Sequence, residues 1–432
     1  MGVDMKEKIR TRQAKVGVIG LGYVGLPLAV EFARAGLHVT GFDVDATKVA
    51  EINAGRSYIG DVLTEDVAEA VKAGTLRATT DMAQLADMDA IDICVPTPLN
   101  KTRDPDLSYV VKSVEAVKAR LQKGQLVILE STTYPGTTDE VVQPLLEEGG
   151  LVAGEDFYLA FSPERVDPGN TVYGTRTIPK VVGGVNPVST DLAGALYGTI
   201  IDTVVPVSST RVAEMVKLLE NTFRAVNIGL VNEIALMSHR MDLNVWEIID
   251  AASTKPFGFM PFYPGPGLGG HCIPIDPFYL SWKARQSGFE CRFIELAGNV
   301  NGSMPEFVVE RVGEALNTVK KAINGSRIHV MGVAYKKDVN DMRESPALDI
   351  MELLIKRGAT VTYTDPFVPH LRHADLDLHS VPEAEAGPGV DCAVICTNHS
   401  TFDYVSMPGR FPLVLDTRNA LKGISGANIF RL

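Results

Sequence analysis

The sequence predicts an α/β protein in which two doubly wound domains are joined by a long central helix. Short β-branched runs alternate with helical patterns from residue 15 onward, which is typical of a parallel sheet with helices on both faces. Apolar residues then recur at steps of three and four from Met215 to Met241, the period of one helix face. A second cycle of strand, helix and strand begins near Ser326.

The first cycle contains six expected strands. The first strand leads into a glycine-rich turn, and the second is closed by Asp43. A helical pattern ending at Gly36 separates these two strands, and another covers residues 107–121. The expected strands lie at residues 15–20, 38–42, 90–95, 125–130, 157–162 and 180–183.

The central helix is expected to begin at the capping residues 208–210. A helix of this length, about 45 Å, exceeds the diameter of a small domain, so we expect it to bridge the two domains and to offer a surface to a second subunit. A long core helix in a monomer is the alternative. Its apolar stripe consists of Met215, Leu219, Phe223, Val226, Leu230, Ile234, Met237 and Met241.

The second cycle supplies the other domain. A strand at residues 327–333 is followed by a helix at 345–357 and by strands at 360–364, 392–396 and 413–415. The expected division of the chain is therefore a first α/β domain at residues 1–207, a central helical domain at 208–325 and a second α/β domain at 326–432.

Composition excludes several classes of protein. The 432 residues carry a net charge of −12, which argues against a nucleic-acid partner but not against an anionic small ligand held by a few local donors. Residues 1–15 lack the apolar core of a signal peptide, and no apolar run is long enough to span a membrane, so we expect a cytoplasmic protein. Five cysteines without metal-ligand spacing suggest neither a disulfide framework nor a metal site.

Gly20, Gly22 and Gly25 form a dinucleotide fingerprint between the first strand and its helix. The first glycine makes the turn, the second lets the backbone approach a pyrophosphate, and the third allows close packing of helix on strand. Asp43 would accept hydrogen bonds from the ribose hydroxyls and repel a 2′-phosphate, which favours NAD over NADP. The motif therefore predicts that the first domain is Rossmann-like and binds NAD through residues that include Tyr23 and Val24. A glycine-rich turn with no ligand is the alternative.

A second glycine-rich loop carries a thiol. Residues 264–270 contain four glycines and two prolines, which is incompatible with the interior of a helix or strand. We expect a tight loop on which a ligand lies close to the backbone. Cys272 ends this loop and Asp276 follows four residues later, so Cys272 is a candidate nucleophile. A buried, inert cysteine beside a turn is the alternative.

Two further pairs of polar residues are candidates for catalysis. Lys217 and Asn221 are four residues apart, so they share a helix face and can together stabilise an oxyanion, although such pairs are often only a solvated face. Glu164 and Thr133 follow expected strands, where ligands collect in such sheets, and can hold a water; either can equally be a cap or a turn former. A thiol, a carboxylate and an NAD site together suggest that an alcohol is oxidised to an aldehyde, trapped by the thiol, oxidised again and hydrolysed.

At these residues the chain resembles the UDP-glucose/GDP-mannose dehydrogenase family over nearly its whole length. The block Gly-Gly-His-Cys-Ile-Pro-Ile-Asp at residues 269–276 is specific to that family. The resemblance implies four-electron oxidation of the C6 alcohol of a nucleotide sugar. It implies that Cys272 is the nucleophile, Lys217 the base and oxyanion partner beside Asn221, and Asp276 an aid to proton transfer, while Glu164 and Thr133 position the hydrolytic water.

The same resemblance assigns the binding residues. Thr97 and Ser131 are expected near the nicotinamide, in addition to the fingerprint glycines and Asp43. The expected substrate contacts are Glu164, Arg165, Lys217, Asn221, Tyr335, Lys336, Arg418 and the backbone of Gly267, Gly269 and Gly270. We also expect a homodimer or a dimer of dimers.

Two departures from the UDP-glucose members point to the branch of the family that acts on 2-acetamido sugars. His271 replaces the usual serine before the cysteine, and the Pro-Glu pair is followed at residues 165–170 by Arg-Val-Asp-Pro-Gly-Asn where those members have apolar residues. Within that branch, the block Tyr263–Leu280 is most similar to the members that act on UDP-N-acetylglucosamine, so the resemblance implies this substrate, in a pathway to surface polysaccharides. UDP-N-acetylmannosamine, UDP-N-acetylgalactosamine and UDP-glucose remain alternatives, as does a sensor that binds NAD and a nucleotide sugar without chemistry. A hydroxyacid dehydrogenase would explain neither the Cys272 loop nor the second α/β domain.

Overall fold

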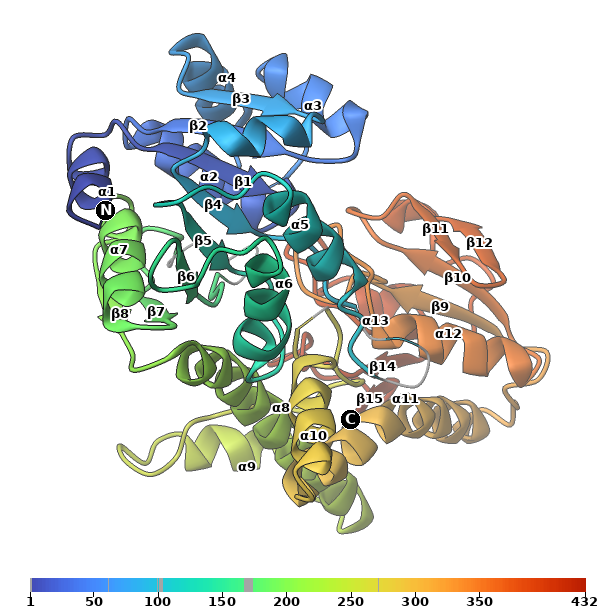
Figure 1. The fold of residues 1–432 in the computed structure, drawn as a ribbon. Coiled ribbons are helices and arrows are strands. Elements are labelled where there is room, and N and C mark those ends of the chain that lie inside the picture. Colours follow the sequence, from blue (N-terminus) through green and yellow to red (C-terminus); the bar gives the residue numbers. More distant parts are fainter. Residues whose placement is uncertain (1, 61, 99, 101–103, 167–173, 271) are drawn as a thin grey trace. The chain divides into compact units, whose positions relative to one another are not determined.

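The computed structural model describes residues 2–60, 62–98, 100, 104–166, 174–270 and 272–432. Its contacts divide the chain into two compact units, whose elements are labelled in Figure 1. The first unit runs to Glu220 and includes Phe278–Ser287, and the second consists of Asn221–Pro277 and Gly288–Leu432. Division into three domains at residues 207 and 325 stays a prediction.

The first unit is built on an eight-stranded sheet with the order β3-β2-β1-β4-β5-β6-β7-β8. Its first six strands pair in parallel in the order 3-2-1-4-5-6, which is the doubly wound order of dinucleotide-binding folds. β7 pairs antiparallel with β6, and β8 pairs parallel with β7. The strands are β1 (Lys15–Ile19), β2 (His38–Phe42), β3 (Leu76–Thr79), β4 (Ala90–Ile93), β5 (Leu126–Leu129), β6 (Tyr158–Phe161), β7 (Lys180–Gly184) and β8 (Val204–Pro206).

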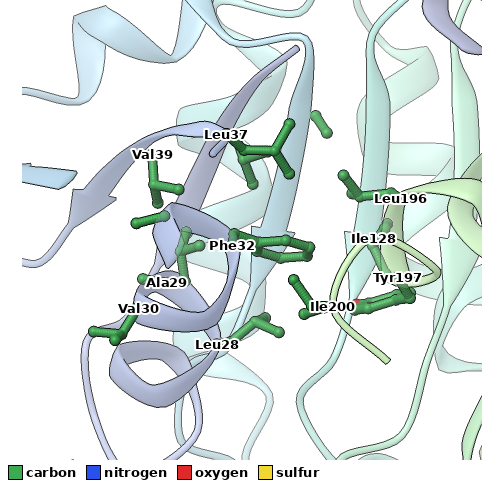
Figure 2. Close-up of a cluster of buried hydrophobic side chains, with 14 of the residues drawn as sticks. Leu28, Ala29, Val30, Phe32, Leu37, Val39, Ile128, Leu196, Tyr197 and Ile200 are labelled. Atoms are coloured by element: carbon green, nitrogen blue, oxygen red, sulfur yellow. The ribbon is translucent and has the colours of Figure 1, made fainter. Parts of the chain in front are cut away.

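Helices cover both faces of this sheet and enclose two apolar clusters. In the cluster of Figure 2, Phe32 packs among side chains of the sheet and α7, with its ring centroid 6.0 Å from that of Tyr197. The charged N-terminal segment forms a helix whose Met5 and Ile9 are buried in the same cluster. The helices are α1 (Gly2–Arg10), α2 (Gly25–Arg34), α3 (Ala46–Asn53), α4 (Thr64–Lys72), η1 (Met82–Asp87), α5 (Ser108–Lys118), η2 (Thr138–Val142), α6 (Gln143–Glu147) and α7 (Pro187–Tyr197).

The predicted long helix is confirmed as α8 (Thr210–Arg240), with 31 residues. Its first part belongs to the first unit and the remainder, from Asn221, to the second. The apolar stripe is largely exposed, because Leu219 is 57% and Leu230 54% exposed, whereas buried positions of the helix include the polar residues Glu214 and Lys217. Within the described residues, α8 and the other helices all lack the combination of length and apolar character that crossing a membrane requires.

The second unit holds a five-stranded parallel sheet with the order β10-β9-β13-β14-β15. In chain order this is 2-1-3-4-5, the other common doubly wound arrangement, so the predicted fold class is confirmed. Strands β9 (Arg327–Met331), β10 (Thr360–Thr364), β13 (Cys392–Ile395) and β14 (Val414–Asp416) were expected from the sequence, whereas β15 (Ile429–Arg431) and the hairpin β11 (His370–His373) and β12 (Leu376–His379) were not. The helices are α9 (Val245–Ala252), α11 (Arg292–Thr318), α12 (Pro346–Lys356), η3 (Glu383–Glu385) and α13 (Met407–Arg410); α10 (Asp276–Gln286) begins in this unit and continues in the first.

Candidate active site

The glycine fingerprint forms an open turn between β1 and α2. Gly20 has φ +91°, a conformation that side chains rarely adopt. A Cβ atom on Gly25 would lie 1.8 Å from the carbonyl oxygen of Gly20, so this glycine lets the helix pack against the turn. A Cβ atom on Gly22 would meet no atom within 4 Å. The space beside Gly22 is therefore open, as a pyrophosphate lying against the backbone requires, and the residues present fit a dinucleotide. Tyr23 is exposed and Val24 precedes the helix.

Asp43 ties the fingerprint turn to the end of β2. Its Oδ2 accepts a hydrogen bond from the backbone N–H of Leu21 at 2.9 Å, and its Oδ1 accepts one from Asp45 N–H at 2.9 Å. Each carboxylate oxygen has two lone pairs, so both keep the capacity to accept from a ribose hydroxyl. The backbone bonds fix the carboxylate beside the turn before any ligand is present.

Hydroxyl residues lie at the carboxyl ends of β4 and β5. Ser131 Oγ donates to the carbonyl of Val95 at 2.7 Å and so holds two neighbouring strand ends together, and the carbonyl of Thr97 accepts from Tyr279. Thr133 Oγ1 is buried and has no hydrogen-bond partner among the described residues. An unpaired buried hydroxyl is costly, which indicates a position where a bound water or ligand supplies the partner.

Glu164 follows β6 and is held by three donors. Its Oε1 accepts from the backbone N–H groups of Arg165 at 2.7 Å and Val166 at 2.6 Å, and its Oε2 accepts from Lys180 Nζ at 3.1 Å. The guanidinium of Arg165 binds both carboxylate oxygens of Glu220 on α8, at 2.6 and 3.3 Å. Arg165 is thus paired within the protein, and its predicted contact with substrate stays a prediction. Residues 167–170, which belong to the segment that follows the Pro-Glu pair and departs from the UDP-glucose members, lie outside the described residues.

Lys217 lies on the buried side of α8 without an ionic partner. The residue is only 8% exposed, and its side-chain nitrogen makes no hydrogen bond or ion pair with the described residues. A buried lysine without a carboxylate partner is rare in a protein interior. This favours a functional interpretation of Lys217 over a solvated helix face.

Glu214, one turn before Lys217, was missed by the sequence analysis. Its carboxylate accepts from Gly136 N–H at 2.6 Å, Thr138 N–H at 2.9 Å and Thr138 Oγ1 at 2.7 Å. Burial raises the pKa of Glu214 to about 7, against the lowering effect of these bonds. The residue anchors α8 to the loop that follows Thr133. In the sequence, Glu214 lies three residues before Lys217, a spacing that places both on the same face of a helix and that could have identified Glu214.

The second unit brings three predicted catalytic residues together. Asn221 Nδ2 donates to Asp276 Oδ2 at 2.5 Å, and the backbone N–H of Asp276 donates to the carbonyl of Cys272 at 2.8 Å. Asp276 is the first residue of α10, so Cys272 lies in the turn that enters this helix. The backbone of Cys272 is thereby fixed relative to a buried carboxamide and carboxylate.

Cys272 is also distinguished by exposure. Of the five cysteines it is the exposed one, whereas Cys94, Cys392 and Cys396 are buried. Burial raises the pKa of the thiols of Cys392 and Cys396 to about 12 and that of Cys94 well above its usual value. Those three thiols resist forming the thiolate that acts as a nucleophile, so exposure leaves Cys272 as the strongest candidate.

The glycines before Cys272 contact the protein's own side chains. A Cβ atom on Gly269 would lie 2.7 Å from Tyr335 Cβ, and one on Gly270 would lie 2.7 Å from Tyr335 Cε2. A Cβ atom on Gly265 would lie 2.6 Å from Arg418 Nη1, and Gly267 has φ +136°. The loop therefore packs against two predicted substrate residues. Tyr335 and Arg418 occupy the Cβ side of these glycines, and binding of a ligand by the loop backbone stays a prediction.

These residues gather at the carboxyl edge of the second sheet. Tyr335 and the half-buried Lys336 follow β9, and Arg418 follows β14 with its Nε donating to the carbonyl of Cys396 at 2.8 Å. Asp365, directly after β10, accepts from the backbone N–H groups of Val333 and Ala334 at 2.8 and 2.9 Å. It thus repeats the role of Asp43 in the first unit. His271 lies outside the described residues.

Comparison with known proteins assigns all three parts of the chain. Residues 14–201 match the NAD binding domain of the UDP-glucose/GDP-mannose dehydrogenase family, residues 211–303 its central domain, and residues 329–423 its UDP binding domain. The chain is 37% identical over 427 residues to a UDP-N-acetyl-D-mannosamine dehydrogenase from Pyrococcus horikoshii, covering 96% of this chain and 98% of the relative.

Other relatives are named for a different substrate, UDP-N-acetyl-D-glucosamine. The chain is 39% identical over 359 residues to a UDP-N-acetyl-D-glucosamine 6-dehydrogenase from Pseudomonas aeruginosa, covering 83% of this chain and 84% of the relative. Among solved structures, a UDP-D-ManNAc dehydrogenase from Pyrococcus horikoshii superimposes with a TM-score of 0.89 at 36% identity, over 96% of this chain and 98% of that one.

Proposed function

The chain belongs to the UDP-glucose/GDP-mannose dehydrogenase family, and we propose that it oxidises the C6 alcohol of a UDP-2-acetamido sugar to the carboxylate. The overall reaction is R–CH2OH + 2 NAD+ + H2O → R–COO− + 2 NADH + 3 H+. Bound NAD supplies the hydride acceptor, and every proton and acyl transfer then falls to residues of the chain. The observation that carries the proposal is the exposed Cys272, fixed through its backbone beside the Asn221–Asp276 pair.

The residues divide the chemistry between them. Lys217, buried and without an ionic partner, takes the proton of the C6 hydroxyl and afterwards faces the oxyanion as an ammonium. The thiolate of Cys272 bonds to the aldehyde carbon, and loss of a second hydride leaves a thioester. Water then bonds to the acyl carbon and the C–S bond breaks, which gives the carboxylate, the free thiol and one proton. Thr133, with an unpaired hydroxyl, and Glu164 orient this water.

The acetamido sugar proposed first is UDP-N-acetyl-D-glucosamine, for a pathway to surface polysaccharides. A second candidate is UDP-N-acetyl-D-mannosamine, which is favoured by the relative from Pyrococcus horikoshii that matches 96% of this chain. The two sugars differ in configuration at one carbon. NADH formation against UDP-glucose and the UDP-acetamidohexoses separates them, and the preferred sugar should yield two NADH per molecule.

The covalent step has a direct test. The Cys272→Ser variant should bind NAD and lose turnover, while the matched variant Cys291→Ser, at another partly accessible cysteine, should keep it. Full activity in Cys272→Ser, or one NADH per sugar with release of a free aldehyde, would contradict the proposal.

We also propose that the chain acts as a homodimer or a dimer of dimers. The support is the exposed apolar face of α8, which carries Met215, Leu219, Phe223, Leu230 and Met237 and is continued by the exposed Met241 directly after the helix. An exposed apolar face of this length marks an association surface. Because the face repeats on every copy, two copies related by a twofold axis can cover it.

A further inference from the structure

A connected set of buried ionisable groups lies behind Glu164 in the first unit. Lys180 at the start of β7 contacts the carboxylates of both Glu164 and Glu130, and Tyr197 at the end of α7 contacts Glu130 and Asp92. The side chains of Lys180 and Glu130 are 5% and 0% exposed, whereas that of Glu164 is 15% exposed. Glu164 is thus the outermost member of a set that otherwise lies in the interior.

The reversed direction of β7 creates this arrangement. β6 and β7 pair antiparallel, with Phe161 opposite Gly183. Glu164 lies three residues after Phe161, just beyond the end of β6, and Lys180 lies three residues before Gly183. The antiparallel register therefore brings Glu164 opposite Lys180. Glu130 directly follows β5, the neighbour of β6 on its other side. A parallel β7 would have placed Lys180 at the opposite edge of the sheet.

Counting hydrogens shows that the inner part of the set holds a proton. Tyr197 Oη lies 2.9 Å from Asp92 Oδ1 and 2.6 Å from Glu130 Oε2. A phenol has one hydrogen to donate, so the second of these short contacts needs a proton on a carboxyl group. One of the two inner carboxyls is therefore neutral. With that proton in place, the set has two carboxylates for one ammonium.

The electrostatics agree with this distribution. Burial raises the pKa of Asp92 to about 7 and that of Glu130 to about 8. Burial would also raise the pKa of Glu164, but the charge of Lys180, hydrogen bonds to Glu130 and Lys180, and a backbone donor together lower it to about 2. The other ionisable groups around Glu164 are Cys94, Arg165 and Glu220, and the last two are paired with each other.

We propose that Lys180 is a positioning residue for hydrolysis of the thioester. It holds the carboxylate of Glu164 ionised and in place, while the proton shared by Asp92, Tyr197 and Glu130 lowers the charge of the two inner carboxyls from −2 to −1, so that they repel Glu164 less. A carboxylate that already accepts three hydrogen bonds is a weak base, so Glu164 orients the attacking water instead of removing its proton. This inference rests on the proposed function and adds Lys180 to it.

The test separates formation of the acyl-enzyme from its hydrolysis. Enzyme, NAD and the UDP-acetamidohexose that gives the most NADH are mixed and quenched rapidly at pH 4 to 9, and the adduct on Cys272 is quantified by mass spectrometry. Glu164→Gln should accumulate the adduct. Lys180→Met should accumulate it too. Because the opposite charge beside Glu164 is gone, the pKa of Glu164 should rise, and a slowing of hydrolysis toward acid pH (an acid limb) should appear at the low end of the measured range, where the wild-type enzyme shows none.

Glu130→Gln is the matched control, because it changes the other carboxyl bound to Lys180 but keeps the ammonium. The amide that replaces the carboxyl can still donate to Glu164, so no acid limb should appear between pH 4 and 9 and no extra adduct should form. A merely structural role for the whole set would disturb both variants alike. The wild-type enzyme adds a test that is independent of any variant: hydrolysis should show no acid limb at or above pH 4.5, the ordinary value for a glutamate.

Failure of the inference is distinguishable from failure of the proposed function. Absence of adduct in Glu164→Gln overturns the proposed function and this inference with it. Adduct in Glu164→Gln but wild-type behaviour in Lys180→Met overturns the inference alone. A wild-type acid limb near pH 4.5, or an equal acid limb in Glu130→Gln and Lys180→Met, does the same.

Discussion

The same substitution at two glycines of the fingerprint should have opposite consequences. In Gly25→Ala the new Cβ would lie 1.8 Å from the carbonyl oxygen of Gly20 and 3.2 Å from Cys94 Cβ. To reach even a tight contact of 3.0 Å, helix and turn must separate by about 1.2 Å. Backbone atoms cannot move aside as the end of a flexible side chain can. We therefore expect Gly25→Ala to lower the free energy of unfolding by about 3 kcal/mol, the upper part of the usual range for overpacking.

For a unit of this size, that loss corresponds to a fall of about 6–12 °C in Tm. Gly22→Ala meets no atom within 4 Å and has no unfavourable φ, so its stability should stay the same or rise by about 0.4–1 kcal/mol. Its methyl group occupies the space proposed for the pyrophosphate. We therefore expect NAD affinity to fall at least tenfold, about 1.4 kcal/mol.

Circular dichroism melts and calorimetric titration with NAD measure the two quantities separately. The expected pattern is a low Tm for Gly25→Ala, and a normal Tm with weak NAD binding for Gly22→Ala. Equal melting temperatures for the two variants would refute the packing argument. Normal NAD affinity in Gly22→Ala would show that the pyrophosphate does not use the space beside this glycine.

Three further predictions follow from buried and exposed groups. Leu219→Glu with Leu230→Glu should yield monomers in light scattering, whereas Glu233→Gln, at an exposed polar position of α8, should not. Burial, aided by the charge of Arg410, lowers the pKa of His329 to about 4, so the unfolded chain binds its proton first as pH falls. Urea unfolding should therefore lose up to about 3 kcal/mol between pH 6.5 and 4, and His329→Gln should remove that dependence. Glu214→Ala should cost at least about 3 kcal/mol, because three donors lose their acceptor; an unchanged urea midpoint would contradict this.

The sequence was sufficient for the elements whose pattern is local. The strands beside the fingerprint were predicted from short apolar, β-branched runs and the long helix from its periodicity, and the structure confirms them as β1, β2 and α8. The hairpin β11–β12 was missed because its strands have four residues each and carry exposed polar side chains such as Arg372 and Asp377. Short, exposed strands give no alternation long enough to recognise.

For the candidate site, the sequence supplied residues but not their partners. Asn221 and Asp276 were both candidates, yet 55 residues separate them, and their hydrogen bond depends on where α8 and the Cys272 loop lie. Lys180 gave no signal, because its partners follow from strand order and from the reversal of β7. Pairing across a sheet is set by tertiary structure, so a single sequence cannot reveal it.

The exposed stripe of α8 shows a related limit. Periodicity identifies which residues share a face, but it is the same for a face buried in its own chain and for one covered by a second copy. In the single chain, Leu219 and Leu230 are exposed while the polar residues Glu214 and Lys217 are buried. Such an inversion is unfavourable for a lone chain, and it is therefore stronger support for association than the stripe alone.

The two glycine-rich loops show why composition alone does not define a ligand site. Both contain glycines with positive φ and lie beside the carboxyl end of a sheet strand or the start of a helix. At Gly22 the missing side chain leaves open space, whereas at Gly269 and Gly270 the ring and stem of Tyr335 occupy it. The first loop is shaped for something outside the chain, and the second fixes Tyr335 beside the segment that presents Cys272. The same residue type thus serves binding in one unit and positioning in the other, and only the neighbouring atoms distinguish the two.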